Sequence, residues 1–458
     1  MRKLFHLENV VVINLGKSKN KISTGISYFD HMLDQFNFHA QIGLSVEVSR
    51  DNVNVDVPGE IISRGVNGSN EDVHLSKNRY AEPVEMQNLL MEQVGEALGC
   101  EIKIILLSLK NKDGGKGIHR NSRFCCPLHD ALVECNLTAC SDVMGKGKGN
   151  LEVYTLAPYR SFPKTGRIRI GRMLTSLLET FFRALAQSSG LNIKLLKIRG
   201  MNGHHIIESA FKALSRALRN LIDDTNTATL NIDDDATEST WCSNSLSYKE
   251  GIAMDRSGKS QRQTKGTAIS ILLTLDGGGD SKVIIDSGVC TINDFYTALA
   301  REAQISLNVM CNGDTWVDDH HTSEDVSIAI GKVLDNALGT KAGLNRMWCA
   351  TAKVGDTEIE VVMDLSNRPC IRHNLNLGEE NDEEYVGDMS VEMLDHILDS
   401  LVMNGQMTVH ILEIKSDGNL MDCAIATAKA FGRALRFCTA VDPRRAGQTA
   451  SSKGTLSV

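Results

Sequence analysis

The chain carries one sequence pattern twice, on either side of a polar segment. The segment at 212–218, KALSRAL, corresponds to KAFGRAL at 429–435, and further correspondences flank both. An internal repeat of domain length indicates two copies of one structural unit, and it constrains the fold more than any local pattern does. We therefore predict two tandem copies, at 1–222 and 264–458, joined by a polar, acidic linker at 223–263.

Each copy contains both strand-like and helix-like patterns. Apolar residues alternate at 44–48 and at 269–273, which is typical of strands with one buried face. The segments at 204–221 and 323–338 have apolar residues at helical spacing. Because strands and helices are mixed without a regular βαβ order, we predict the α+β fold class. We expect each copy to consist of two similar halves, each with a β-sheet and helices.

Composition excludes several classes of function. The formal net charge of −8 argues against a general nucleic-acid-binding protein. No run of apolar residues approaches the ~18 that a membrane span needs. The 12 cysteines lack the spacing of a metal site and indicate reduced thiols in the core. We therefore expect a cytoplasmic protein that binds neither nucleic acid nor membrane.

Two pentads share the pattern His-His-x-x-Glu, at 204–208 (HHIIE) and at 320–324 (HHTSE). On a helix, residues i and i+4 lie on one face, so each pentad directs a histidine and a glutamate to the same place. The two adjacent histidines point about 100° apart, which suits two neighbouring metal ions better than one. Each pentad is therefore predicted to supply ligands to a pair of metals.

Overlaying the two copies shows that each lacks the candidate ligands that the other keeps. The first copy keeps a group that we call face A, and the second copy has other residue types at these positions: His31, His204, His205 and Glu208. The second copy keeps a group that we call face B, which the first copy lacks: His320, His321, Glu324 and His396. Because the losses do not overlap, a complete ligand set arises only where a face A meets a face B. The sequence leaves open whether the two faces meet within one chain or between chains.

The combined set consists of histidines and glutamates. Imidazole and carboxylate ligands without thiolate suit manganese, iron, cobalt, nickel or zinc. Such a set can hold two octahedral ions and leave positions for a substrate, whereas a closed zinc site needs only about four ligands. The set therefore predicts two-metal catalysis. From the residues alone, a dinuclear hydrolase acting on a phosphorylated substrate and a non-catalytic scaffold both remain open.

Several stretches of the sequence are similar to signatures of the imidazoleglycerol-phosphate dehydratase family. They are 29–35 (FDHMLDQ), 204–208, 318–325 (DDHHTSED), and the C-terminal 442–445 (DPRR) with 451–454 (SSKG). The resemblance covers almost the whole chain, once per copy. The family usually has a single domain of this kind, so the tandem is a departure from its pattern.

The resemblance implies a lyase of histidine biosynthesis, which removes water from imidazole glycerol phosphate and gives imidazole acetol phosphate. It implies a pair of Mn²⁺ ions in each complete site, whose Lewis-acid action lowers the barrier. Glu8 is the implied proton-transfer residue, and His39 is implied to line the substrate. The residues implied to bind the phosphate are Arg346, Arg368, Lys212, Ser452 and Lys453. A retained phosphate pocket disfavours the scaffold, because scaffolding does not need one.

Alternation of the two faces constrains the assembly. A ring of contacts in which every face A meets a face B closes only with an even number of domains, so a three-fold ring cannot hold the metal sites. We predict metal sites at two-fold or four-fold contacts, and like copies at three-fold contacts. The resemblance implies a large homo-oligomer with a shell of about 24 domains, which about 12 chains would build.

Overall fold

The computed structural model describes most of the chain. The described residues are 21–48, 84–112, 121–139, 147–159, 166–223, 256–276, 282–377, 384–416, 419–445, 447–451 and 454–456. No helix within these ranges is long and apolar enough to cross a membrane. The cysteines that lie in this part of the chain are free thiols.

The second copy consists of two halves with the same order of elements. The first half contains β9 (Ser257–Gln263), β10 (Thr267–Thr274), β11 (Val283–Asp286), α6 (Cys290–Ala303), β12 (Ser306–Gly313) and α7 (His320–Leu338). The second half contains β13 (Met347–Val354), β14 (Thr357–Asp364), β15 (Cys370–His373), α8 (Glu392–Asn404), β18 (Thr408–Lys415) and α9 (Leu420–Thr439), with the short β16 (Tyr385–Val386) and β17 (Met389–Ser390) before α8. The two sheets have the orders β9-β10-β12-β11 and β13-β14-β18-β15, so equivalent strands take equivalent places. In both sheets only the last strand runs parallel to its neighbour.

The first copy follows the same plan. Its first half contains β1 (Ile22–Ser23), α1 (Ser27–Ala40), β2 (Val46–Glu47) and α2 (Val84–Lys112). Its second half contains β3 (Asn121–Leu128), β4 (Ala131–Ala139), β5 (Leu151–Tyr154), β6 (Arg169–Ile170), β7 (Met173–Leu174), α3 (Leu178–Ser189), β8 (Leu191–Arg199) and α4 (Gly203–Ile222). The sheet order β3-β4-β8-β5 matches that of the second copy. The predicted α+β class, the tandem repeat and the two similar halves are thereby confirmed.

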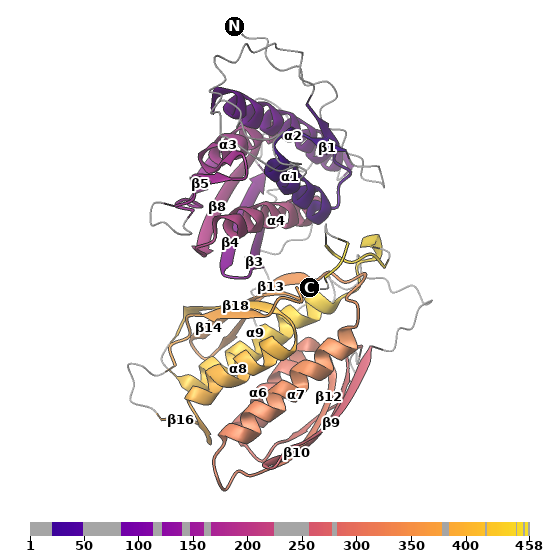
Figure 1. Cartoon of the computed structure of the whole chain (residues 1–458), viewed down its shortest axis with the longest axis vertical. Helices are drawn as coiled ribbons and strands as arrows, with labels where there is room; N and C mark the ends of the chain where they lie inside the picture. The colour runs from indigo at the N-terminus through magenta and orange to yellow at the C-terminus, as the bar shows by residue number, and fades with distance from the viewer. Residues whose placement is uncertain are drawn as a thin grey trace, which may run out of the picture.

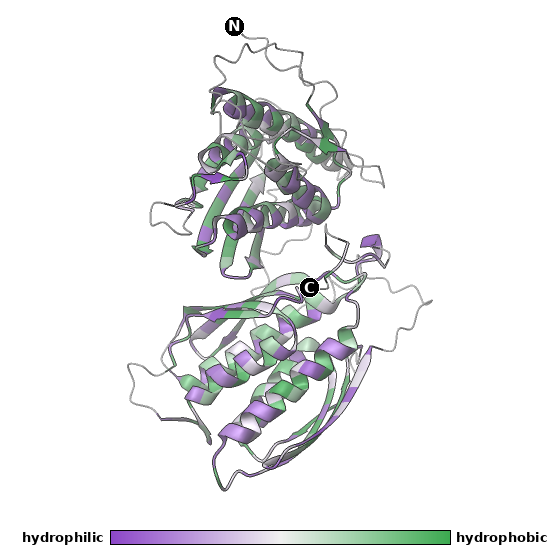
Figure 2. Ribbon diagram, in the orientation of Figure 1, coloured by the Kyte–Doolittle hydropathy of each residue, from purple (hydrophilic) through white to green (hydrophobic). Residues whose placement is uncertain are grey.

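The helices form the layer between the two sheets of a copy. In the second copy, α9 packs on β13 and β14, α7 packs on β9 and β10, and the helices pair as α6 with α9 and α7 with α8 (Figure 1). The first copy keeps the equivalent pairs, α1 with α4 and α2 with α3. Figure 2 shows apolar and polar residues alternating around these helices, as expected for helices that each bury one stripe. These pairings matter for function because candidate ligands lie on both members of a pair.

Glycine permits the closest helix crossings. A Cβ at Gly432 in α9 would lie 2.3 Å from the carbonyl oxygen of Leu299 in α6. A Cβ at Gly331 in α7 would lie 2.8 Å from the carbonyl oxygen of Leu401 in α8. A larger residue would force each pair apart, since a packed interior has no room for the added carbon. The second crossing sets the spacing between the helices that carry face B.

The linker predicted at 223–263 extends too far at its C-terminal end. Ser257–Gln263 form β9, which pairs along its whole length with β10 and belongs to the first sheet of the second copy. The segment is polar because it is an edge strand whose side chains are mostly exposed or half-buried. A polar edge strand and a linker have similar composition, which explains the error.

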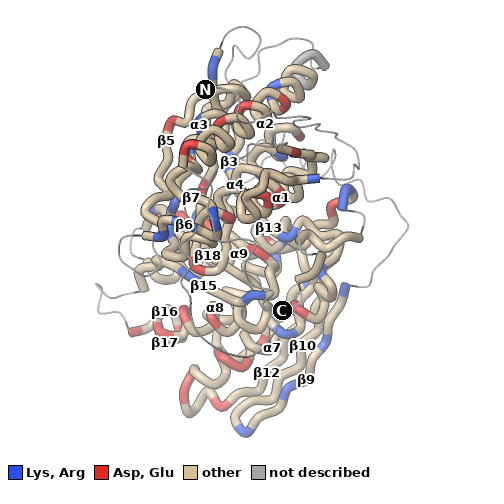
Figure 3. Tube along the Cα trace, turned by 45° about the horizontal axis from the view of Figure 1, so that its top comes forward, with Lys and Arg blue, Asp and Glu red and all other residues tan. Residues whose placement is uncertain are grey.

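The two copies contact each other through the sheets of their second halves (Figure 1). Cys125 and Leu132 of the first copy share a buried apolar cluster with Val362 and Leu412 of the second. Beside this cluster, Arg123 of the first copy donates hydrogen bonds to glutamates of both copies, Glu134 at 2.6 Å and Glu360 at 2.9 Å. Figure 3 shows that acidic and basic residues are otherwise interspersed along both copies. The copies therefore form one packed unit.

Candidate metal centre

The cap of α4 determines where the candidate ligands of the first copy lie. The side-chain oxygen of Asn202 accepts the N–H of His204 at 3.0 Å, so the helix begins at the pentad. One turn along, Oε2 of Glu208 lies 3.2 Å from Nε2 of His204. His31, on the neighbouring α1, places its Nε2 3.8 Å from the same oxygen. The three ligand atoms lie within 4.8 Å of one another, close enough to share one ion.

Glu208 is held as a carboxylate by its surroundings. Burial alone would raise its pKa, but Nζ of Lys212 at 2.6 Å and the two imidazoles hold the pKa well below its usual range. An ionised carboxylate is the form that binds a metal ion. Glu208 is therefore ionised, and able to bind a metal ion, across the physiological pH range.

His205 points from the same helix toward the turn between β3 and β4. Its Nδ1–H donates to Oδ1 of Asp130 at 2.6 Å, which leaves Nε2 free as a ligand. His129 completes a second cluster with these two residues, again with all ligand atoms within 4.8 Å. The sequence interpretation left His129 as structural and did not consider Asp130. No local signal marks either residue, because only the fold brings the turn to the start of α4.

Face B forms on the helix pair α7 and α8 of the second copy. His320 and Glu324 lie one turn apart on α7, and Nε2 of His396 on α8 lies 3.4 Å from Oε1 of Glu324. The imidazole centroids of His320 and His396 are 4.8 Å apart, and the three residues form a third cluster. Nδ1 of His321 lies 3.1 Å from Oδ2 of Asp314. In each pentad the second histidine thus faces an aspartate, and in the first pentad it also belongs to a three-residue cluster.

Equivalent helix positions in the other copy hold other residues. Asn419 caps α9 as Asn202 caps α4, and Met421 and Asp422 follow where the first copy has its two histidines. On α3, Thr180 occupies the place of His396, and its hydroxyl donates to the side chain of Asn88 at 3.0 Å. The positions opposite His320 and His321 lie outside the described residues. Within those residues, each cluster consists of side chains from a single copy.

Lys212 and Arg346 approach one place from different copies. Both are almost fully buried, Lys212 on α4 and Arg346 just before β13. Arg346 forms a two-pronged ion pair with Asp364, at 2.6 and 2.8 Å. The charges of Lys212 and Arg346 both act on the thiol of Cys126, whose burial raises its pKa to about 12. The structure therefore brings together two of the residues predicted to bind phosphate.

His39 lies in a buried group of cations, which we call the cationic pocket. Only 1% of His39 is exposed, and burial lowers its pKa well below the usual value. Positive charges from both copies lower this pKa further: Lys212, Arg346, Arg445 and Arg216. Among the described residues, Nδ1 of His39 has no hydrogen-bond partner. His39 is thus neutral at physiological pH and has a free nitrogen.

The sequence interpretation did not include Arg216 or Arg445 in the site. Burial, together with the charge of Arg216, lowers the pKa of Arg445 to about 9. Nε of Arg216 and Nη2 of Arg445 are buried donors that find no acceptor in the described part of the chain. Buried cations with unfilled donors favour an anion. Arg216 follows Lys212 by one helical turn, a spacing that could have identified it, whereas Arg445 enters from the distant C-terminal segment.

The equivalent pocket of the second copy is neutralised by its own residues. Arg433, on α9, stands where the first copy has Arg216, and Glu302, on α6, stands where it has His39. Nε and Nη2 of Arg433 donate to the Glu302 carboxylate at 2.8 and 3.2 Å. A carboxylate at this point competes with a phosphate for the same guanidinium. Among the described residues, the second copy therefore has no counterpart of the cationic pocket.

Arg368 is not brought into this group. Arg368 lies in the turn after β14, where its N–H donates to Ser366 and its carbonyl accepts from Thr408. Glu8, Ser452 and Lys453 lie outside the described residues.

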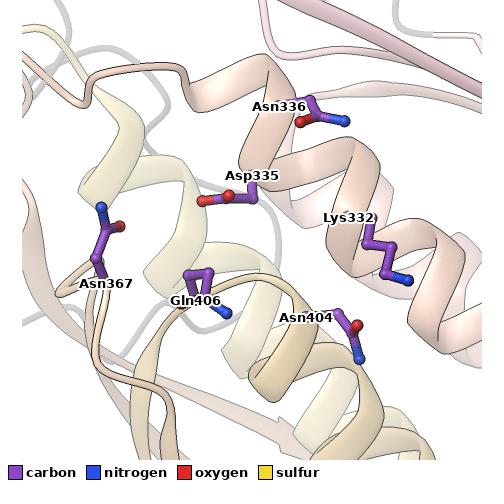
Figure 4. A pocket seen from close by; sticks show the side chains of 6 residues that line it. All are labelled: Lys332, Asp335, Asn336, Asn367, Asn404 and Gln406. Carbon is purple, nitrogen blue, oxygen red and sulfur yellow. The ribbon is translucent and has the colours of Figure 1, made fainter. Parts of the chain in front are cut away.

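A polar pocket of about 580 Å³ lies away from all of these clusters. It opens between the C-terminal ends of α7 and α8 (Figure 4), and its lining residues are Lys332, Asp335, Asn336, Asn367, Asn404 and Gln406. Asp335 and Asn367 also hold the buried ammonium of Lys341. The pocket contains none of the candidate ligands, so it does not define the site.

Two buried histidines make stability depend on pH. His410 on β18 is fully buried, and burial lowers its pKa to about 4, while His39 is shifted in the same direction. Unfolding returns both pKa values to ~6.5, so between pH 6.5 and 4 the unfolded chain binds more protons and stability falls as pH falls. We expect His410→Gln to remove about 2–3 kcal/mol of this loss, measured as urea unfolding at pH 7 and pH 4.5. An unchanged slope in that variant would contradict the assignment.

The donor sets fit divalent metal ions. Each cluster offers imidazole nitrogen and carboxylate oxygen without thiolate, which suits manganese and its neighbours. Nε2 of His396 is buried and has no hydrogen-bond partner among the described residues, as expected for a ligand atom. The fold and these clusters define a tandem α+β protein with the histidine–carboxylate sites that metalloenzymes use.

Comparison with known proteins identifies the family. The sequence model of the family described as imidazoleglycerol-phosphate dehydratase matches residues 84–218 and 287–435, one match in each copy. These matches span more than half of the chain. The chain belongs to the imidazoleglycerol-phosphate dehydratase family as a tandem duplication of its domain, and it is a lyase of the dehydratase type.

Individual relatives match about half of the chain. "Imidazoleglycerol-phosphate dehydratase 1, chloroplastic" of Arabidopsis thaliana is 39% identical over 215 residues, which are 46% of this chain and 76% of that protein. The imidazoleglycerol-phosphate dehydratase of Prochlorococcus marinus (strain NATL1A) is 37% identical over 201 residues, 44% of this chain and 96% of that protein. The crystal structure of the dehydratase from Staphylococcus aureus is 28% identical with a TM-score of 0.35, covering 40% of this chain and 99% of that one.

Proposed function

We propose that the chain dehydrates imidazole glycerol phosphate to imidazole acetol phosphate in histidine biosynthesis, using Mn²⁺. The observation that carries this proposal is a pair of complementary ligand faces, of which face A adjoins a cationic pocket. Face A and face B would together hold two ions, and bound Mn²⁺ would supply Lewis-acid activation of the substrate. The names of the relatives support the same reaction.

The chain's own residues would bind and orient the phosphorylated end of the substrate. Lys212, Arg216 and Arg445 offer buried cationic donors to a phosphate dianion. Neutral His39, with its free Nδ1, can accept a hydrogen bond from the substrate in the same pocket. Glu8 remains the candidate for moving the proton that leaves carbon, while the hydroxyl departs as water.

We further propose that each complete site forms between chains. The cationic pocket joins face A to the second copy of the same chain, yet the described clusters do not mix the two faces. Face B must then come from another chain. Apolar side chains next to both faces are largely exposed, Met201 at 64%, Trp316 at 81% and Val317 at 63%. Mutual burial of these side chains favours such a contact, and about 12 chains would close the proposed shell.

A direct assay tests the reaction. The purified chain, loaded with Mn²⁺, is incubated with imidazole glycerol phosphate, and the ketone product is followed by absorbance. We expect turnover that a chelator abolishes and that fresh Mn²⁺ restores. Release of inorganic phosphate instead of the ketone would favour a metallohydrolase, and no turnover by the metal-loaded protein would contradict the proposal.

A further inference from the structure

The orientation of His205 depends on Asp130. Because a carboxylate can only accept, its Oδ1 fixes the proton of His205 on Nδ1 and leaves Nε2 for a metal. The other oxygen, Oδ2, accepts the backbone N–H groups of Met201 and Asn202 at 2.8 and 3.1 Å. These bonds, acting against burial, lower the pKa of Asp130 below its usual range. The aspartate thus ties the β3–β4 turn to the start of α4.

The turn that carries Asp130 is held from the other copy. His129, which precedes it, has a φ of 53°, a conformation that non-glycine residues adopt at a cost. Its carbonyl accepts a hydrogen bond from Nε2 of His410, on β18 of the second copy, at 2.8 Å. A carbonyl cannot donate, so the proton of His410 lies on Nε2. Nδ1 of His410 is buried without a partner among the described residues, which agrees with that tautomer.

A second link from the first copy anchors the same region. Arg199, at the end of β8, donates to the carbonyls of Arg372 and Ile411 at 2.9 and 3.1 Å. Ile411 follows His410 on β18, so both sides of the contact are fixed at one point of the interface. The position of the turn is therefore set by the second copy.

We infer that His410 is a positioning residue for the metal face of the first copy, acting through the His129 carbonyl and Asp130 on His205. This inference rests on the proposed role of His205 as a metal ligand. It gives the second copy a function within its own chain, in addition to supplying face B to another.

The second copy holds the β3–β4 turn of the first copy, but within the described residues the first copy does not hold the equivalent turn of the second. The strand position equivalent to His410 in the first copy is Lys194 on β8, whose exposed ammonium pairs with Glu152 of the same copy at 3.4 Å. The turn equivalent to 129–130 lies between β13 and β14, where Asp356 pairs instead with Lys415 at 3.1 Å. The first copy therefore does not offer the same hydrogen bond to the second. This asymmetry matches the loss of the second copy's own histidine pair at the start of α9.

The test compares two replacements of His410. His410→Ile removes the hydrogen-bond donor and keeps an apolar side chain in the buried site, whereas His410→Gln keeps an N–H at a similar distance. Mn²⁺ binding to the full chain is measured by electron paramagnetic resonance of the free ion. We expect His410→Ile to weaken Mn²⁺ binding about tenfold, because loss of a hydrogen-bond partner behind a metal ligand commonly has an effect of this size. In His410→Gln, the affinity should stay within about threefold of the unchanged chain.

A double variant separates positioning from a general loss of structure. In a chain that already carries His205→Ala, the change His410→Ile should weaken Mn²⁺ binding no further, because its effect passes through His205. Glu360→Gln, which weakens the copy interface elsewhere, should leave the affinity unchanged. Equal losses in the Ile and Gln variants, additive losses with His205→Ala, or no loss would overturn the inference. If the unchanged chain bound no Mn²⁺, the proposed metal centre would fall, and this inference with it.

Discussion

Chains carrying His204→Ala and chains carrying His320→Ala should each be inactive alone, and an equal mixture should regain about a quarter of the unmodified activity. His204 belongs to face A and His320 to face B, so each variant lacks one half of every site. In a mixed assembly, a site is complete only when its face A comes from a His320→Ala chain and its face B from a His204→Ala chain. Random assembly brings these together at about one contact in four.

The measurement needs assemblies that contain both variants. The two chains are produced together with different affinity tags, and mixed assemblies are selected by both tags before assay. A mixture of His204→Ala with Glu208→Gln is the matched control, since both changes damage face A and no pairing repairs it. If sites formed within one chain, the first mixture would be as inactive as the control.

Much of the fold could be predicted from the sequence because it depends on local patterns. The helices predicted at 204–221 and 323–338 lie within α4 and α7, and the strand predicted at 269–273 lies within β10. Helical spacing also places His204 with Glu208 and His320 with Glu324 on one face, whatever the rest of the chain does. The repeat then reduced the architecture to one domain plan used twice. The edge strand β9 was missed because its polar composition resembles a linker.

The rest of the site could not be predicted from the sequence because it depends on contacts between distant segments. Asp130 meets His205 across 75 positions, and His410 meets His129 across 281. Arg445 reaches the pocket of His39 from the C-terminal segment, although its neighbour Arg444 is half-exposed and pairs with Asp223. Such pairs have no periodicity in the sequence. They follow only from the packing of the two copies against each other.

That packing also changes how the duplication is understood. Overlay of the copies suggested two half-sites, each of which is complete only when it meets the other. The structure adds that the cationic pocket of the first copy includes Arg346 and Arg445 of the second, so one chain already joins two domains at a site. The second copy replaced His39 with Glu302, which pairs with Arg433 and closes the reciprocal pocket.

Lys212→Met should reduce kcat/KM about a thousandfold, while Lys429→Met, at the equivalent position of α9, should change it less than about threefold. Lys212 is 3% exposed, bonds Glu208 at 2.6 Å and contributes to the cationic pocket. Removing one partner of such a buried, hydrogen-bonded charge pair costs several kcal/mol, and a phosphate dianion would lose a cation as well. Lys429 is half-buried, and the residue one turn before it is Ile425, not a carboxylate. Methionine keeps most of the apolar stem in both variants, so the comparison isolates the charge.

Steady-state kinetics on both variants, with unfolding midpoints as a check on folding, measure this difference. Addition of Mn²⁺ to saturation separates two causes of the loss in Lys212→Met. A kcat/KM that stays low at saturating metal indicates weaker binding of the phosphate. Recovery of kcat/KM at saturating metal indicates that Lys212 acts by keeping Glu208 ionised. Equal losses in Lys212→Met and Lys429→Met would contradict the assignment of a single working pocket, because the second copy would then bind substrate as well. Its Glu302–Arg433 pair predicts that it does not, since a phosphate entering there would have to displace a carboxylate already bound to the guanidinium.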